Sequence, residues 1–417
     1  MYGKGILVRT RYSGAGAFGR GPRVSRRTKA GLGVVVAVVA GVVGGALVLN
    51  GSTKVSLSDH SSREHSGFSS HFSSGWSFST LNNRNDPTFN QLLGINNRGQ
   101  IAGYFGSGAA GHPNKGYLLN LSRNGSWFAN ENFPHGIQTQ VIGINDLGTT
   151  VGFWSDQNTA SMTNDNFGFY AWGGHFHSVS FPTRNNASPP VNQLLGVNDE
   201  NVAVGFYTDA KGNNHGYTYS INRHRFRSVY IWGATSVTPS GINNEGDITG
   251  FFTGSSGAIK AFLLRSNGRL TTLAFPGAAM TQGFGVNDSR EVVGTYTTGT
   301  GTAAKTFGFT WSSFAGWKVV NDPLGVGATT INGVNDAGDL VGFYTDAAGN
   351  TDGFLLAAGR HSAPFAPGVA QIQINVVTPT ATPTVTVSPT ATPSVAPTSA
   401  TVTVPASTVP ASQPTHY

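Results

Sequence analysis

One short pattern occurs six times in this chain, and it restricts the possible folds more than any other feature. The pattern is Gly-Ile/Val-Asn, followed by a second Gly nine residues after the first. The copies begin at Gly94, Gly143, Gly196, Gly241, Gly285 and Gly333, and the second glycines are Gly103, Gly152, Gly205, Gly250, Gly294 and Gly342. The spacings of 49, 53, 45, 44 and 48 residues are typical of propellers, solenoids and arrays.

Each copy contains four short apolar segments separated by polar turns. In the first copy, residues 91–96 and 100–105 flank the turn Asn97-Arg98-Gly99. After a variable loop, the third segment opens with a small residue and an aromatic one. These pairs are Gly116-Tyr117, Gly168-Phe169, Gly216-Tyr217, Ala261-Phe262, Gly308-Phe309 and Gly353-Phe354. The fourth segment often ends in Phe-Pro, which suits a strand end because proline cannot donate a ladder hydrogen bond.

The turn between the first two segments predicts an antiparallel hairpin. In the sixth copy, Asn335 and Asp336 suit a type I turn, and Gly338 supplies the left-handed residue of a bulged hairpin. Asn201 replaces this glycine in the third copy, and Asn tolerates the left-handed conformation. Arg290 replaces it in the fifth copy, so we expect that turn to be strained or different.

The second segment of each copy carries apolar residues on both faces, as in residues 339–344 (DLVGFY). A sheet covered on both sides has this pattern. A glycine inside a strand weakens it, so the second glycine predicts close backbone approach or crowding against a neighbouring sheet. Four short antiparallel strands in about 48 residues form a propeller blade. A β-solenoid is the alternative, although solenoids favour shorter coils and parallel pairing.

We therefore predict an all-β fold, a six-bladed β-propeller of four-stranded antiparallel blades over residues 76–375. One N-terminal hydrophobic helix precedes it and a disordered tail follows it. Residues 76–82 resemble a fourth segment with no repeat before it, and the sixth copy ends weakly at residues 361–368. We expect residues 76–82 to complete the sixth blade and close the ring.

The consensus of the six copies resembles the extracellular HAF repeat, which is named for a His-Ala-Phe triplet. The likeness spans residues 88–367, and Lys260-Ala261-Phe262 is nearest to the triplet, whereas most copies have Gly-Phe or Gly-Tyr. The resemblance implies an exported, propeller-like repeat protein. It implies no activity that can be assigned to individual residues.

The amino-terminal residues predict export. Residues 30–49 contain no charged residue, and a helix of this length crosses a hydrocarbon core of about 30 Å. Residues 1–29 carry eight Lys or Arg and no acid, so they should remain cytoplasmic. We predict a cell-membrane protein with a single transmembrane anchor and an extracellular C-terminal body, or a secreted protein if residues 30–49 are a cleaved signal helix. A twin-arginine signal at residues 25–29 and a buried soluble helix are weaker alternatives.

The charge and composition of the other segments exclude several classes. The eight basic residues exceed the net charge of +7, so residues 31–417 carry a net charge of −1. We therefore predict no nucleic-acid partner. We also expect the protein to be a monomer. Residues 50–75 form a Ser-rich stalk, in which the irregular spacing of His60, His65 and His71 favours a solvated linker over a metal site. Residues 376–417 contain eight Pro and predict a disordered tail that is either O-glycosylated or solubilising. The chain has no Cys.

No group of residues matches a catalytic motif. Most acids lie in the repeat turns and are interpreted as turn residues: Asp146, Asp199, Glu245, Asp247, Asp288, Asp336 and Asp339. The acids outside the pattern are Glu131, Asp156, Asp165 and Asp322, and nothing in the sequence pairs them. A glycosidase needs two carboxylates that face one bond. We therefore assign no catalytic residue and favour a protein that is not an enzyme.

The best binding candidates lie in the loops between the second and third segments of the third and sixth copies. Residues 207–217 and 344–354 share Tyr-Thr-Asp-Ala-x-Gly-Asn, and the candidate residues are Asp209, Asn213, His215, Asp346, Asn350 and Asp352. Their oxygens could bind Ca²⁺, but the spacing is not that of an EF-hand and Gly-Asn is common in turns, so we expect no cofactor. A tryptophan such as Trp232 could form a sugar- or peptide-binding patch.

These observations predict a non-enzymatic surface module, exported and tethered to the membrane through residues 30–49. It would bind a cell-wall glycan or a surface protein through its loops. The alternative is a cell-wall or polysaccharide-directed hydrolase or lyase with its site at the central channel.

Overall fold

The computed structural model of the chain describes residues 77–121, 126–158 and 164–358. The described residues form 24 β-strands and one 3-10 helix, η1 (Gly301–Ala303). No helix among them is long and apolar enough to span a membrane. The predicted cytoplasmic segment 1–29, helix 30–49, stalk 50–75 and tail 376–417 lie outside the described residues, as do Trp76 and residues 359–375.

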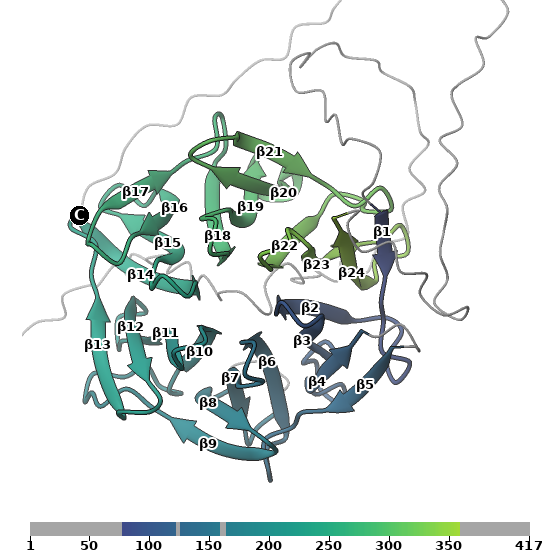
Figure 1. The fold of residues 1–417 in the computed structure, drawn as a ribbon, viewed down its shortest axis with the longest axis horizontal. Helices are drawn as coiled ribbons and strands as arrows, with labels where there is room; N and C mark the ends of the chain where they lie inside the picture. Colours follow the sequence, from purple (N-terminus) through teal and green to yellow (C-terminus); the bar gives the residue numbers. More distant parts are fainter. Residues whose placement is uncertain (1–76, 122–125, 159–163, 359–417) are drawn as a thin grey trace, which may run out of the picture. The chain divides into compact units, whose positions relative to one another are not determined.

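The described strands form a β-propeller of six antiparallel, four-stranded blades (Figure 1). Blade 1 consists of β2 (Asn90–Ile95), β3 (Gln100–Phe105), β4 (Lys115–Asn120) and β5 (Trp127–Asn130). Blade 2 consists of β6 (Gln138–Ile144), β7 (Thr150–Ser155), β8 (Phe167–Trp172) and β9 (His175–Val179). Blade 3 consists of β10 (Asn192–Val197), β11 (Val202–Thr208), β12 (Asn214–Ser220) and β13 (Arg225–Val229).

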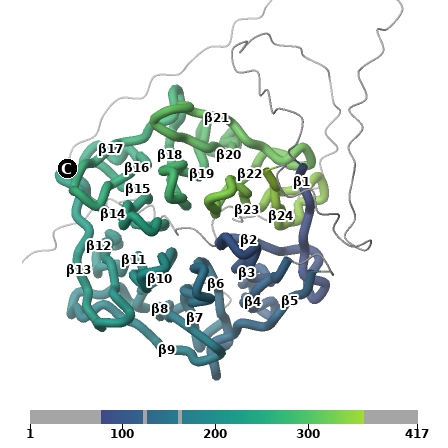
Figure 2. The backbone as a smooth tube through the Cα atoms, in the orientation of Figure 1, coloured from purple at the N-terminus to yellow at the C-terminus, as the bar shows by residue number. Residues whose placement is uncertain are grey.

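The second half of the ring has the same order. Blade 4 consists of β14 (Ala234–Ile242), β15 (Ile248–Gly254), β16 (Ile259–Leu264) and β17 (Leu270–Leu273). Blade 5 consists of β18 (Met280–Val286), β19 (Val292–Thr298), β20 (Lys305–Ser312) and β21 (Gly316–Val320). Blade 6 consists of β22 (Thr329–Val334), β23 (Leu340–Thr345), β24 (Thr351–Ala357) and β1 (Ser77–Thr80). The strand next to the axis carries the repeat pattern, and the fourth strand lies at the perimeter (Figure 2).

The ring is closed by a strand from the other end of the propeller. β1 pairs antiparallel with β24, with Ser77 opposite Ala357 and Thr80 opposite Phe354. The pairing continues beyond the strand, where the Leu81 N–H donates to the Gly353 carbonyl at 2.8 Å. The predicted closure by the segment that begins at residue 76 is therefore confirmed for its described residues. Backbone hydrogen bonds, and not a loop alone, join the two ends of the ring.

The second glycines are explained by a bulge in the neighbouring strand. In blade 1 the pairing register of β2 shifts between Leu92 and Gly94, and each of the other five inner strands has a shift one residue before its repeat glycine. A Cβ added at Gly103 would collide with the Gln91 carbonyl oxygen of the same blade. The other five second glycines face an inner-strand carbonyl in the same way. The predicted close approach is confirmed, and it lies within a blade and not between sheets.

The repeat glycines bring the blades together at the axis. A Cβ added at Gly94 would lie 2.7 Å from the Ile142 carbonyl oxygen and 3.0 Å from the Gly143 Cα of the next blade. The equivalent contact recurs at all six junctions, and the last one joins Gly333 to the Leu93 carbonyl of blade 1. A side chain at these positions would force the inner strands apart, so glycine sets the radius of the ring.

Buried apolar side chains pack within the blades and between neighbouring blades. The aromatic residue that opens each third strand is fully buried in all six blades: Tyr117, Phe169, Tyr217, Phe262, Phe309 and Phe354. One further cluster draws residues from five blades: Leu93, Tyr104, Ile142, Phe153, Leu195, Phe206, Phe251 and Phe284. This cluster joins five consecutive blades through buried apolar contacts.

We expect Gly250→Ala to lower the free energy of unfolding by about 3 kcal/mol, because its methyl group would overlap the Thr238 carbonyl and the Phe262 ring. Gly254→Ala, at the end of the same strand, is the matched control, since its methyl group would meet its nearest neighbour at 3.8 Å. Urea unfolding of both variants measures the difference. Equal effects would contradict the assigned role of the second glycine.

Candidate functional site

The turns between the first and second strands of all six blades meet at one end of the axis. Each turn contributes the Ile or Val, the Asn, and the following Asn or Asp of its repeat. Together these residues surround a cavity of about 90 Å³. The two polar residues of each repeat form two separate rings of hydrogen bonds around it.

The first ring consists of six buried asparagines. They are Asn96, Asn145, Asn198, Asn243, Asn287 and Asn335. Each Nδ2 donates to the carbonyl oxygen of the asparagine in the next blade at 2.8–3.4 Å, and Asn335 donates to Asn96 to close the circle. Each Oδ1 accepts the backbone N–H four residues later in its own turn. One side chain thus shapes its own hairpin and binds the neighbouring blade.

The second ring consists of the residues that follow the asparagines. They are Asn97, Asp146, Asp199, Asn244, Asp288 and Asp336. The backbone N–H of each donates to the Oδ1 of the next at 2.7–2.9 Å, again in a closed circle. The interpretation of these aspartates as turn residues was therefore incomplete, because they also join the blades.

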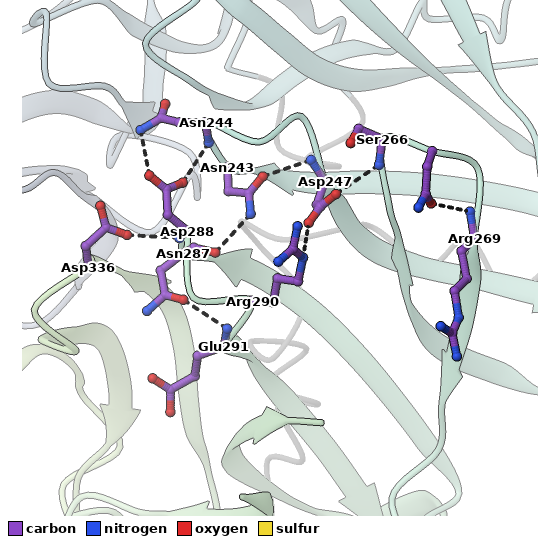
Figure 3. Close-up of polar contacts among 11 residues, drawn as sticks. Asn243, Asn244, Asp247, Ser266, Arg269, Asn287, Asp288, Arg290, Glu291 and Asp336 are labelled. Carbon is purple, nitrogen blue, oxygen red and sulfur yellow. Dashed lines mark hydrogen bonds and ion pairs between the residues drawn. The ribbon is translucent and has the colours of Figure 1, made fainter. Parts of the chain in front are cut away.

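Two side-chain amides of the second ring each donate hydrogen bonds to two of its four carboxylates. Asn97 Nδ2 donates to Asp146 and Asp336, at 2.9 and 2.8 Å. Asn244 Nδ2, halfway around the ring, donates to Asp199 and Asp288, each at 3.1 Å. Figure 3 shows its contact with Asp288. Every carboxylate accepts both an amide and a backbone N–H, so these acids are engaged in holding the ring.

The two turns without glycine keep the left-handed conformation, with φ of 56° at Asn201 and 62° at Arg290. Each of these side chains reaches the preceding blade. Asn201 Oδ1 accepts from the Thr149 hydroxyl at 2.9 Å. Arg290 Nε lies 2.6 Å from Oδ2 of Asp247, whose side chain is 1% exposed (Figure 3). The expected strain at Arg290 is confirmed, and the buried ion pair offsets it.

The predicted binding residues do not form one site, because blades 3 and 6 lie on opposite sides of the ring (Figure 1). In blade 3, Asp209 accepts the backbone N–H of Lys211 and of Asn213, and its Oδ2 lies 2.9 Å from His215 Nε2. Burial alone would raise the pKa of Asp209, but hydrogen bonds from His215 and the backbone outweigh it and lower this pKa to about 2.

In blade 6, Asp346 accepts the backbone N–H of Asn350 at 2.8 Å and its side-chain amide at 3.0 Å. Asp352 turns away from this loop and accepts from Asn82 Nδ2 at 2.6 Å. Within residues 77–358, where the structure describes them, no three His, Asp or Glu side chains are arranged to hold a metal ion. The Ca²⁺ prediction is untested.

Three of the four acids outside the pattern, Asp156, Asp165 and Asp322, have an acidic neighbour that the sequence did not reveal. Burial and, to a smaller extent, the charge of Asp352 together raise the pKa of Asp322 to about 6. Burial also raises the pKa of Asp165, and Asp156 adds to this effect. The acid pair at Asp322 and Asp352 comes from a connection between blades and from β24, so only the fold brings it together.

Among the tryptophans that the structure describes, the most exposed one lies in the connection between blades 3 and 4. Trp232 is 89% exposed and the nearby Tyr230 is 69% exposed. This connection has a defined backbone, because the Ala234 N–H donates to the Ile231 carbonyl at 3.1 Å and Gly233 has a φ of 77°. The sequence singled out Trp232, and the structure presents it to solvent.

The axis offers little support for the predicted alternative of a hydrolase or lyase at the central channel. The four carboxylates at its turn end accept hydrogen bonds from neighbouring blades. Among the described residues, the raised carboxyl pKa values belong to groups away from this axial cavity.

The sequence matches no protein-family model and no curated protein. Solved structures with a similar fold include a fungal fucose-recognising lectin from Aleuria aurantia, described as a six-bladed β-propeller, with 11% identity and a TM-score of 0.41 over 66% of this chain and 93% of the lectin. A putative TolB from Agrobacterium tumefaciens has 12% identity and a TM-score of 0.43, over 68% and 98% of the two chains. A gluconolactonase from Xanthomonas campestris has 12% identity and a TM-score of 0.36, over 65% and 86%. These likenesses bear on the arrangement of the blades alone.

We expect Asn198→Ala to lower the free energy of unfolding by about 2–4 kcal/mol, because it leaves the Asn243 carbonyl and the Val202 N–H without their partner. Asn222→Ala, at an exposed turn position of the same blade, should change it by less than about 0.5 kcal/mol. Urea unfolding provides the comparison. A loss below 1 kcal/mol for Asn198→Ala would show that the ring is incidental.

The acid pair Asp322 and Asp352 predicts that its contribution to the free energy of unfolding falls as pH rises. The pKa of Asp322 is raised to about 6 in the folded state, so the folded protein must bury its charge and loses stability between about pH 4 and pH 6. Asp322→Asn keeps an oxygen for the Leu324 N–H and should raise the free energy of unfolding at pH 7.5 by about 1–3 kcal/mol.

The same substitution should bring no gain at pH 4, where the native carboxyl is protonated. Asp346→Asn is the control, because hydrogen bonds from Asn350 lower the pKa of Asp346. Removing this carboxylate should therefore not raise the free energy of unfolding at pH 7.5. Thermal unfolding across this pH range tests both variants. Equal gains at pH 4 and pH 7.5 for Asp322→Asn would rule out the charge as the cause.

Proposed function

We propose that this protein is a non-enzymatic binding module whose partner contacts the exposed aromatic connection between blades 3 and 4. The observation that carries the proposal is Trp232, which is 89% exposed in a connection with a defined backbone. Tryptophan and tyrosine are the residues that contribute most often to the centre of binding surfaces.

The chemistry of the pair Tyr230 and Trp232 favours a glycan or a peptide as partner. Both rings combine a flat apolar face with one polar hydrogen-bonding group. A sugar ring presents a similar combination, with apolar C–H groups on its face and hydroxyls at its edge. Neither side chain supplies a nucleophile or a carboxylate, which supports recognition and not turnover at this position.

The cellular setting belongs to the same proposal. The uncharged run at residues 30–49 and the basic residues before it support an exported monomer, either anchored in the cell membrane or secreted after cleavage. The repeat consensus supports a relationship to the extracellular HAF-repeat proteins. In this setting the partner would be a cell-wall glycan or a surface protein.

A binding screen tests the proposed function. The full chain, purified in detergent, is assayed against an array of neutral and acidic glycans, peptidoglycan fragments and peptides. Trp232→Ala should weaken binding to the recognised class at least about tenfold, or about 1.4 kcal/mol. Phe314→Ala, which removes a fully exposed aromatic residue from blade 5, should leave binding unchanged. Equal effects of the two variants, or turnover of any array member, would overturn the proposal.

A further inference from the structure

The outer strand of blade 3 carries an unusual concentration of positive charge. Arg225 and Arg227 lie on β13, and Arg223 lies in the turn before it; all three side chains are exposed. The ion pairs found among the described residues join His215 to Asp209 and Arg290 to Asp247, so none involves these arginines. We call Arg223, Arg225 and Arg227 the arginine edge.

The strand geometry places two of these guanidinium groups on one face. Alternate residues of a strand point the same way, with Cα atoms about 6.7 Å apart. Arg225 pairs with Ser220 of β12 and Arg227 with Thr218, so two hydroxyl side chains lie beside the arginines on that face. β13 ends at Val229, and Tyr230 and Trp232 follow directly. Along the chain at the outer strand of blade 3, the arginines and their hydroxyl neighbours are therefore followed by the exposed rings of Tyr230 and Trp232.

We propose that the arginine edge binds the acidic groups of a polysaccharide while Trp232 contacts the face of a neighbouring sugar ring. This inference rests on the proposed function and adds the class of ligand. Guanidinium groups bind carboxylate and sulfate in a planar, two-bond arrangement that ammonium groups cannot reproduce. The partner is thus a glycan that bears carboxylate or sulfate groups, with uncharged sugar surface between them.

The amount and extent of the charge favour this partner over nucleic acid. Residues 31–417 carry a net charge of −1, so the arginine edge is a local feature and not part of a wide basic surface. Proteins that bind nucleic acid usually neutralise many consecutive phosphates. Three arginines beside an aromatic pair suit a chain whose charges are fewer and are separated by apolar ring faces.

Blade 2 supplies a built-in control. Its outer strand β9 has the sequence His-Phe-His-Ser-Val, where β13 has Arg-Phe-Arg-Ser-Val. His175 and His177 occupy the positions of Arg225 and Arg227, and they are also exposed. The His177 ring stacks on Tyr170, with ring centroids 4.7 Å apart. The two strands therefore share their place in the blade and their exposure, but they differ in the groups offered to a ligand.

The test measures binding of the full chain to immobilised polygalacturonate, with dextran sulfate as a second acidic glycan, at about 50 mM salt, where charge interactions are little screened. Arg225→Gln/Arg227→Gln should weaken binding to at least one of the two about 30-fold or more, and Arg225→Lys/Arg227→Lys should recover part of it because the charge returns without the planar fork. His175→Gln/His177→Gln at pH 8 should have no effect. Circular dichroism checks that each variant is folded.

Three further probes separate the outcomes. Neutral dextran should not bind, and poly-glutamate and single-stranded oligothymidine should bind at least tenfold more weakly than the preferred acidic glycan. If poly-glutamate or oligothymidine binds tightly and Trp232→Ala does not weaken glycan binding, the arginine edge binds any polyanion without selectivity. That result would overturn the inference. If Trp232→Ala abolishes binding to some glycan while the arginine variants bind normally, the proposed function stands and this inference fails. If neither set of variants changes any binding, both fail.

Discussion

Six asparagine side chains hold the blades of this propeller to one another, and the circle that they form has no free end. Each amide nitrogen binds the next blade, and each amide oxygen fixes the turn of its own blade. Because the groups are buried, breaking one junction would leave both partners unsatisfied, which costs more than the bond itself contributes. The same few atoms thus specify the local hairpin and the global ring.

The second ring and the glycines depend on this arrangement. The backbone N–H groups of the following residues can reach the next carboxylate or amide only because the asparagines hold adjacent turns in register. The glycines allow the inner strands to approach until the Cα atoms of neighbouring blades are almost in contact. Where the first and last strands of the propeller meet, β1 pairs with β24 of blade 6, so backbone hydrogen bonds close the ring.

Much of this fold could be predicted from the sequence, because residues close together in the chain determine its turns and strands. The hairpin turns, the buried third-strand aromatics and the closing strand follow from turn chemistry, periodicity and an unpaired segment before Gly94. The asparagine rings could not be found this way, since their partners lie 44 to 53 residues apart at five junctions and 239 residues apart at the closing one. Their one signal was the presence of Asn at the same offset in all six copies, which turn geometry alone does not require.

The candidate sites divide in the same way. Trp232 was recognisable as an aromatic residue outside the repeat pattern, whereas the pair Asp322 and Asp352 exists only because a connection packs against β24. The sequence likeness of residues 207–217 and 344–354 reflects a shared turn, and the ring places the two loops far apart. Residues shared by all six copies hold the ring, whereas the outer strands β9, β13 and β17 differ in sequence.

Hydrogen exchange of the turn amides tests the closed ring most directly. The six N–H groups concerned belong to Asn97, Asp146, Asp199, Asn244, Asp288 and Asp336, and each lies in a surface turn. If the ring is closed, the protection factors of all six amides should agree to within about tenfold. This includes the N–H of Asp336, which donates to Asn97 Oδ1 at 2.8 Å across the junction between blades 6 and 1. Exchange of these amides at the rate of an unstructured peptide, or rapid exchange at Asp336 alone, would contradict it.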